Sequence, residues 1–80
     1  LDLFPNPVID ALQVQLASKQ KETAAIFIAD ASGKKVWSGS IQLTEGNNAT
    51  SIPVVQLPKG TYYFTFENKE GKETKAFIKN

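Results

Sequence analysis

The sequence contains no cysteine, no histidine, no methionine and no arginine. Without cysteine, the chain can form neither a disulfide framework nor a zinc–thiolate site, and thiol usage gives no information on the redox compartment. The lack of histidine and cysteine excludes histidine-based catalytic triads and thiol nucleophiles. The lack of arginine removes the forked donor group with which proteins recognise phosphate and base edges. We therefore do not expect a nucleic-acid partner.

The chain also lacks a long apolar segment. No run approaches the ~18 residues that a membrane-spanning helix needs, and the first residues, LDLFPNPV, include neither a basic n-region nor a start methionine. We therefore expect a piece of a longer polypeptide with no membrane-spanning segment. The 80 residues are 41% hydrophobic with a net charge of +1, which predicts one small domain over residues 1–80.

Apolar and polar residues alternate with a period of two along most of the chain, which is the pattern of half-buried β-strands. The segment 23–30, TAAIFIAD, is apolar on both faces and is expected to be a central strand. Gly39 is expected to form a bulge or bend, and Pro53 indicates an edge position because proline has no amide for a central ladder. No window has helical periodicity, so the domain is expected to be all-β. The expected strands are residues 11–17, 23–30, 35–43, 49–57, 61–68 and 72–80.

Three turns punctuate these strands. The segments 30–33, DASG, and 68–71, NKEG, each begin with a side chain that can accept a backbone hydrogen bond and end with glycine. Both suit a type I turn closed by a glycine bulge, so both are expected to form hairpins. The segment 57–60, LPKG, places proline and glycine at turn positions. Six or seven short strands joined in this way predict a two-layer antiparallel β-sandwich.

In this order and spacing, FPNP, DALQV, DASGKKV, LPKGTYYF and a lysine-bracketed last strand resemble the type A C-terminal sorting domain of the type IX (Por) secretion system. The resemblance covers nearly the whole chain, and it departs from the family at Pro53, where similar domains more often carry a polar strand residue. It implies an immunoglobulin-like β-sandwich. The residues of the family motif, which we expect to be mainly structural, are Phe4, Pro5, Asn6, Pro7, Asp30, Gly33, Lys34, Leu57, Gly60 and Tyr62.

The resemblance also implies a function. Such domains direct an upstream cargo protein from the periplasm of a Gram-negative bacterium across the outer membrane. The implied partners are the type IX translocon and a sortase-like peptidase of the outer membrane. This peptidase commonly removes the domain and transfers the cargo to lipopolysaccharide. The implied final location is the cell surface or the medium, and neither a cofactor nor a metal is expected.

The last strand is the segment that we expect the secretion machinery to recognise. An edge strand offers unpaired amides and carbonyls for strand addition by a partner, and alternation places Lys75, Phe77 and Lys79 on one face. We expect Phe77 to be the apolar anchor for the translocon and Ala76 and Ile78 to face the sandwich. An alternative is that the lysines only protect an edge from aggregation. The expected recognition residues are Lys75, Phe77, Ile78, Lys79 and Asn80.

Other functions remain open from the residues alone. A cell-surface module that binds carbohydrate would use exposed Trp37 and Tyr63 as its platform, and a third alternative is a spacer domain. Tyr62 is expected in the core with its hydroxyl bonded back to the preceding turn. Exchange of the terminal edge strand between two copies would give a dimer at high concentration.

Catalysis by a carboxylate pair is conceivable because glycoside hydrolysis needs only two acids. The candidate acids lie at turns or beside lysines, where turn capping or solvated charge explains their presence. We therefore expect no enzymatic activity. Calcium at 44–50, TEGNNAT, or near Asp30 would lack the dense acid spacing of a dedicated loop. The acids considered are Asp2, Asp10, Asp30, Glu45, Glu67, Glu70 and Glu73.

Overall fold

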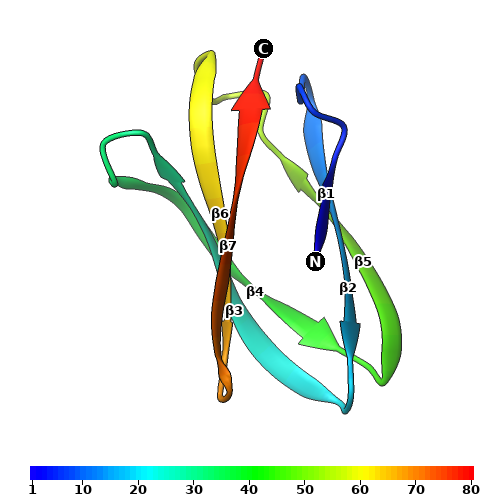
Figure 1. Ribbon diagram of the computed structural model, residues 1–80. Coiled ribbons are helices and arrows are strands. Elements are labelled where there is room, and N and C mark those ends of the chain that lie inside the picture. Colours follow the sequence, from blue (N-terminus) through cyan, green and yellow to red (C-terminus); the bar gives the residue numbers. More distant parts are fainter.

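The computed structural model describes residues 1–80 and consists of seven β-strands joined by short turns, as Figure 1 shows. Five of the strands lie where the alternation predicts them, and the short first strand was not predicted. The strand expected over 49–57 is shifted, since it runs from Gly46 to Pro53 and residues 54–57 form a turn. The strands are β1 (Asp2–Phe4), β2 (Ala11–Ser18), β3 (Glu22–Asp30), β4 (Lys35–Leu43), β5 (Gly46–Pro53), β6 (Gly60–Asn68) and β7 (Gly71–Lys79).

The strands form two sheets, one of three strands in the order β1-β2-β5 and one of four in the order β4-β3-β6-β7. Neighbouring strands in both sheets are antiparallel, and the sheets face each other across a shared core (Figure 1). The prediction of an all-β antiparallel sandwich is therefore confirmed. As expected, β3 is central, since it lies between β4 and β6.

The core is built from side chains that alternate inward on both sheets, because successive strand residues point to opposite faces. From β3, Ile26 and Ile28 are buried, and from β6, Tyr62 and Phe64 are buried. The segments outside the strands contribute as well, since Val8 and Val54 are completely buried. The buried cluster consists of Val8, Leu12, Val14, Ile26, Ile28, Ile52, Val54, Leu57, Tyr62, Phe64 and Phe77.

The turn between β3 and β4 has the predicted hairpin geometry. The Gly33 amide donates a hydrogen bond of 3.0 Å to the Asp30 carbonyl, and the Asp30 amide donates one of 2.8 Å to the Lys34 carbonyl. Gly33 has a φ of +90°, which a side chain would strain. The Asp30 carboxylate accepts hydrogen bonds from the Ser32 amide (3.0 Å), the Ser32 hydroxyl (2.6 Å) and the Lys34 amide (3.0 Å). One aspartate therefore organises the whole turn, as expected of an acid at its first position.

Of the other two turns, the one at Asn68 agrees with the sequence. Asn68 and Gly71 are directly paired across the β6–β7 hairpin, and the Asn68 side-chain oxygen accepts a 3.0 Å hydrogen bond from the Glu70 amide. Before β6, the Leu57 amide donates a 3.0 Å hydrogen bond to the Val54 carbonyl, so the hydrogen-bonded turn lies at 54–57 and not at 57–60 as predicted. The Tyr62 hydroxyl donates a 2.6 Å hydrogen bond to the Pro58 carbonyl. Tyr62 is thus in the core with its hydroxyl tied back to the segment before β6, as predicted.

Two strand irregularities differ in part from expectation. The bulge in β4 leaves Val36 as the extra residue opposite the Ile28–Ala29 step, not Gly39 as predicted. Gly39 instead leaves room for the Trp37 ring, because a Cβ there would lie 3.0 Å from the ring atom Cη2. Pro53 ends β5, and β5 is an edge strand of its sheet, as expected.

Candidate functional site

The last strand, β7, forms the outer edge of the four-stranded sheet and pairs only with β6 within it. The β6–β7 ladder runs from the Asn68–Gly71 pair at the hairpin to the Gly60–Lys79 pair at the far end. The expectation that the final strand lies at an edge is therefore confirmed. Six consecutive residues, Gly71–Ala76, are exposed to solvent.

The two faces of β7 are the reverse of the expected arrangement. Phe77 is only 1% exposed and its ring stacks on Tyr62, so a partner of the folded domain cannot reach it. Ile78 is 47% exposed, and Ala76 is exposed as well. The apolar surface that β7 presents to solvent is thus the row of Ala76 and Ile78. The alternation was predicted correctly, but nothing in the sequence indicates which of the two rows the other sheet covers.

The two residues at the end of the chain are also held in place. Lys79 follows the buried row of Phe77 and is only 6% exposed. Its ammonium group donates a hydrogen bond of 3.0 Å to the main-chain oxygen of Asn80. A lysine buried to this extent must keep a polar partner because an unpaired buried charge is costly. Lys75, on the same face but farther from the core, is exposed.

The segment that follows β1 crosses to the terminal strand and covers part of its outer edge. The Val8 amide donates a 2.7 Å hydrogen bond to the Ile78 carbonyl, and the Asn80 amide donates one of 2.9 Å to the Val8 carbonyl. These two bonds make a parallel bridge between Val8 and Lys79. Figure 1 shows this segment beside the C-terminal end of β7. We call residues Asn6–Val8 the clamp.

The clamp includes the second half of the FPNP motif. The side-chain oxygen of Asn6 accepts a 3.0 Å hydrogen bond from the Ile78 amide, and both X–Pro bonds of the motif, Phe4–Pro5 and Asn6–Pro7, are cis. Phe4 itself is 41% exposed. Within the motif, Asn6 is the residue that bonds the terminal strand. The sequence did not reveal this contact because its partners lie 72 residues apart.

The hydrogen bonds of the clamp also show which backbone groups of β7 are free. In an antiparallel strand, alternate residues direct their amide and carbonyl to the same side. Ile78 directs both groups away from β6, toward the clamp. Lys72, Thr74 and Ala76 precede Ile78 at intervals of two residues. Their amides and carbonyls must therefore also point away from β6, into solvent. The outer edge of β7 is closed by the clamp at its end and open over Lys72–Ala76.

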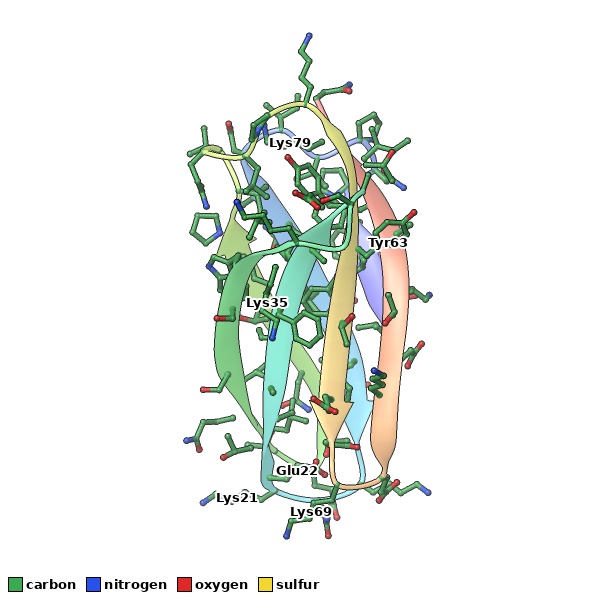
Figure 2. All side chains as sticks on the ribbon, turned by 90° about the vertical axis from the view of Figure 1, so that its left-hand side faces the viewer. Lys21, Glu22, Lys35, Tyr63, Lys69 and Lys79 are labelled. Carbon is green, nitrogen blue, oxygen red and sulfur yellow. The ribbon has the colours of Figure 1, made fainter.

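The outer face of the four-stranded sheet carries a small apolar strip beside this edge. Tyr63 is directly opposite Ala76 in the β6–β7 ladder and is 40% exposed. On the neighbouring strands β3 and β4, the Lys35 ammonium lies 4.3 Å from the centre of the Phe27 ring, a favourable cation–π distance. Figure 2 shows Lys35 and Tyr63 on this face, and Lys21, Glu22 and Lys69 gathered at the end remote from Lys79.

Trp37 and Tyr63 do not form a common platform. Trp37 is opposite Ile28 in the β3–β4 ladder and packs against the core, whereas Tyr63 is opposite Ala29. Since Ile28 and Ala29 are successive strand residues, the two aromatic side chains lie on opposite faces of the sheet. The arrangement that a glycan platform requires is therefore absent, and nothing in the structure favours that alternative.

The acidic residues do not gather into a metal site. No group of three or more acids is placed to hold a metal ion. The pKa of Asp30 is lowered by the Ser32 hydroxyl above all, and then by the Lys34 amide, which is the effect of the turn itself. Asp30, Gly33 and Lys34 lie together at the β3–β4 turn, Leu57 is buried before β6, and Gly60 and Tyr62 lie in β6. No helix in the structure could span a bilayer.

Comparison with known protein families gives a match over almost the whole chain. The family model described as "Secretion system C-terminal sorting domain" matches residues 2–80. No curated protein and no solved structure gives a match. Domains of this family are sorting signals for type IX secretion and are not catalytic domains. The match spans almost the whole chain, so the protein belongs to the type IX secretion system C-terminal sorting domain family and serves to export the cargo to which it is attached.

Proposed function

We propose that β7 is the element of this sorting domain that the type IX translocon recognises. The observation that supports the proposal is the position of β7, which is an edge strand with Gly71–Ala76 exposed and an exposed apolar side chain at Ile78. Edge strands are the usual place where one protein adds to the sheet of another. The remaining sandwich holds the strand by its buried Phe77.

In this proposal the domain passes through the periplasm with its upstream cargo. At the outer membrane a sortase-like peptidase then separates cargo from domain, and the cargo stays at the surface or enters the medium. Of the expected recognition residues, Lys75, Ile78 and Asn80 lie exposed on the folded domain. Phe77 and Lys79 are buried, and their part in recognition would be to hold β7 in its position on the sandwich.

The test is export of a fluorescent carrier that bears a periplasmic export signal and is fused upstream of Leu1, in a bacterium with a type IX system. The informative variant is Ile78→Glu, since Ile78 is 47% exposed and its replacement leaves the core intact. Val55→Glu is the matched control, because Val55 is 66% exposed and lies outside β7. Thermal unfolding of each purified domain shows whether the fold is retained.

We expect the unmodified domain and Val55→Glu to be exported and Ile78→Glu to remain in the periplasm while still folded. Export of Ile78→Glu at the normal level would show that this face of β7 is not recognised. Retention of the unmodified domain would contradict the sorting function of the chain in that host.

A further inference from the structure

The open stretch of the β7 edge differs chemically from the part that the clamp covers. Over Lys72–Ala76 three residues, Lys72, Thr74 and Ala76, direct their amides and carbonyls into solvent, as the alternation from Ile78 requires. A row of such groups is a template for one more strand. At Ile78–Asn80 the clamp already provides the equivalent partners. An added strand can therefore pair with the middle of β7 but not with its end.

The side chains beside this open stretch specify one face of the added strand. Ala76 is small and exposed, and it lies directly opposite Tyr63, which is 40% exposed on the adjacent strand. Directly opposite residues of neighbouring strands have Cβ atoms about 4.5–5.5 Å apart, and aromatic side chains reach beyond their nearest neighbour. A large apolar side chain placed beside Ala76 can thus extend over it and contact the Tyr63 ring. Ile78, next on the same face, enlarges this apolar surface.

The charges of β7 indicate which side chain would fit on the other face of the added strand. The strand carries three lysines and one glutamate, and of the lysines only Lys79 is buried with a main-chain partner. Lys75 is exposed on the face opposite Ala76. Opposite charges directly across a strand pair stabilise the pairing, and like charges weaken it. An acidic side chain beside Lys75 is therefore the matching residue on an added strand.

From these observations we propose that Lys72–Ala76 binds an extended segment of a partner protein as an additional strand of the four-stranded sheet. The segment places a large apolar side chain over Ala76 against Tyr63 and an acidic side chain beside Lys75. This inference rests on the proposed recognition of β7 and names its mode: the partner pairs with the open half of the edge while the clamp stays in place.

A proline tests this mode with little effect on the fold. Proline is tolerated in an edge strand where its missing amide would face solvent. Ala76→Pro removes an outward amide of β7 and blocks strand addition sterically. Ser40→Pro is the matched control on β4, the opposite edge of the same sheet. The alternation of backbone groups between the two sides of a strand can be followed from β7 through β6 and β3 to β4. Counted in this way from Ile78, the amide of Ser40 points out of the sheet at the β4 edge, and the residue is exposed.

The readout is export of the fluorescent carrier, with thermal unfolding of each domain as the check on folding. We expect export of the unmodified domain and of Ser40→Pro, and retention of folded Ala76→Pro in the periplasm. If Ala76→Pro is exported, or if Ser40→Pro is retained equally, strand addition to β7 is wrong although the sorting function stands. If the unmodified domain is retained, the sorting function fails and the inference with it. Should Ala76→Pro unfold, Lys72→Pro removes another outward amide and is judged by the same outcomes.

A separate variant tests whether the partner places an acidic side chain beside Lys75. Lys75→Glu places a like charge beside the expected acidic residue, and Lys59→Glu makes the same charge change at an exposed turn residue outside β7. We expect export of Lys75→Glu to fall well below that of Lys59→Glu, and to recover in part at higher medium salt because exposed charges are screened. Equal export of the two variants would overturn the assignment of an acidic partner residue.

Discussion

The ring of Tyr62 stacks on the ring of Phe77, with centroids 5.7 Å apart and planes inclined by 23°. Both side chains are buried, and the Tyr62 hydroxyl is bonded to the Pro58 carbonyl. The contact therefore connects the segment before β6 to the last strand of the chain. The strand that is proposed as the recognition element is at the same time part of the core, so its exposed and buried faces must be altered separately.

Removal of Lys75–Asn80 is expected to unfold the domain. The deletion eliminates Phe77, which is 1% exposed and belongs to the buried cluster, and a large buried side chain lost in this way costs about 3–5 kcal/mol. Small domains have only about 5–15 kcal/mol in total. Circular dichroism of the truncated domain gives the result. A truncation that keeps the cooperative thermal transition of the full domain would contradict the place of Phe77 in the core.

Substitution Tyr62→Phe is expected to lower the free energy of unfolding by about 0.5–1.5 kcal/mol, the usual net value of one hydrogen bond. It removes the 2.6 Å bond to the Pro58 carbonyl while the stacked ring remains. Urea unfolding measures the change. Tyr63→Phe is the control, since Tyr63 is on the exposed face and no hydrogen bond of its hydroxyl is present. Equal effects of the two substitutions would mean that the Tyr62 hydroxyl has no special role.

Substitution Asn6→Ala is expected to loosen the clamp at one point. The Ile78 amide loses its side-chain acceptor and should exchange its hydrogen faster. The Asn80 amide, which is bonded to the Val8 carbonyl, should change less. Amide hydrogen exchange followed by NMR distinguishes the two positions. Asn47→Ala, at an exposed position of β5, should leave both rates unchanged, and unchanged exchange at Ile78 in Asn6→Ala would show that the side chain does not protect this amide.

The stability of the domain is expected to fall in acid partly through Asp30. The pKa of Asp30 lies below its ordinary value of 3.8 in the folded protein, chiefly because the Ser32 hydroxyl donates to it. A lowered folded-state pKa means that the carboxylate stabilises the fold above pH 3.8 and that this contribution is lost as the pH falls through the folded value. The difference in stability between the unmodified domain and Asp30→Ala should therefore shrink in this range.

The titration of Asp30 can be followed directly by NMR. In Ser32→Ala, which removes the main cause of the shift, the pKa of Asp30 should rise toward its ordinary value. An unchanged titration curve in Ser32→Ala would show that another group holds the pKa down.

Substitution Gly39→Ala is expected to destabilise the domain by about 1–3 kcal/mol, the usual cost of overpacking. The new Cβ would lie 3.0 Å from the Trp37 ring, which must shift. Tryptophan fluorescence during urea unfolding reports both the environment of the ring and the stability. Ser38→Ala, at an exposed position of the same strand, is the control. A Gly39→Ala domain as stable as the control would show that the ring moves aside without cost.

Much of the fold was readable from the sequence because its causes are local. The period of two determines the strands, and the turns at Asp30 and Asn68 carry the acceptor and glycine that their geometry requires. The position of β3 between two other strands follows from its lack of a polar face, and Pro53 at a strand end follows from its missing amide. The first strand, Asp2–Phe4, escaped prediction because three residues do not establish a period.

The candidate site depends on contacts between distant parts of the chain. Alternation by itself determined that Phe77 and Ile78 face opposite ways, but only the packing of the second sheet decided that Phe77 is buried and Ile78 exposed. Nothing local connects Asn6 with Ile78. That bond exists because the segment between β1 and β2, two strands of the three-stranded sheet, passes beside β7 of the four-stranded sheet. Local patterns fix which residues share a face, because they reflect backbone geometry. Which face is covered, and which edge stays open, is decided only when both sheets come together around one core.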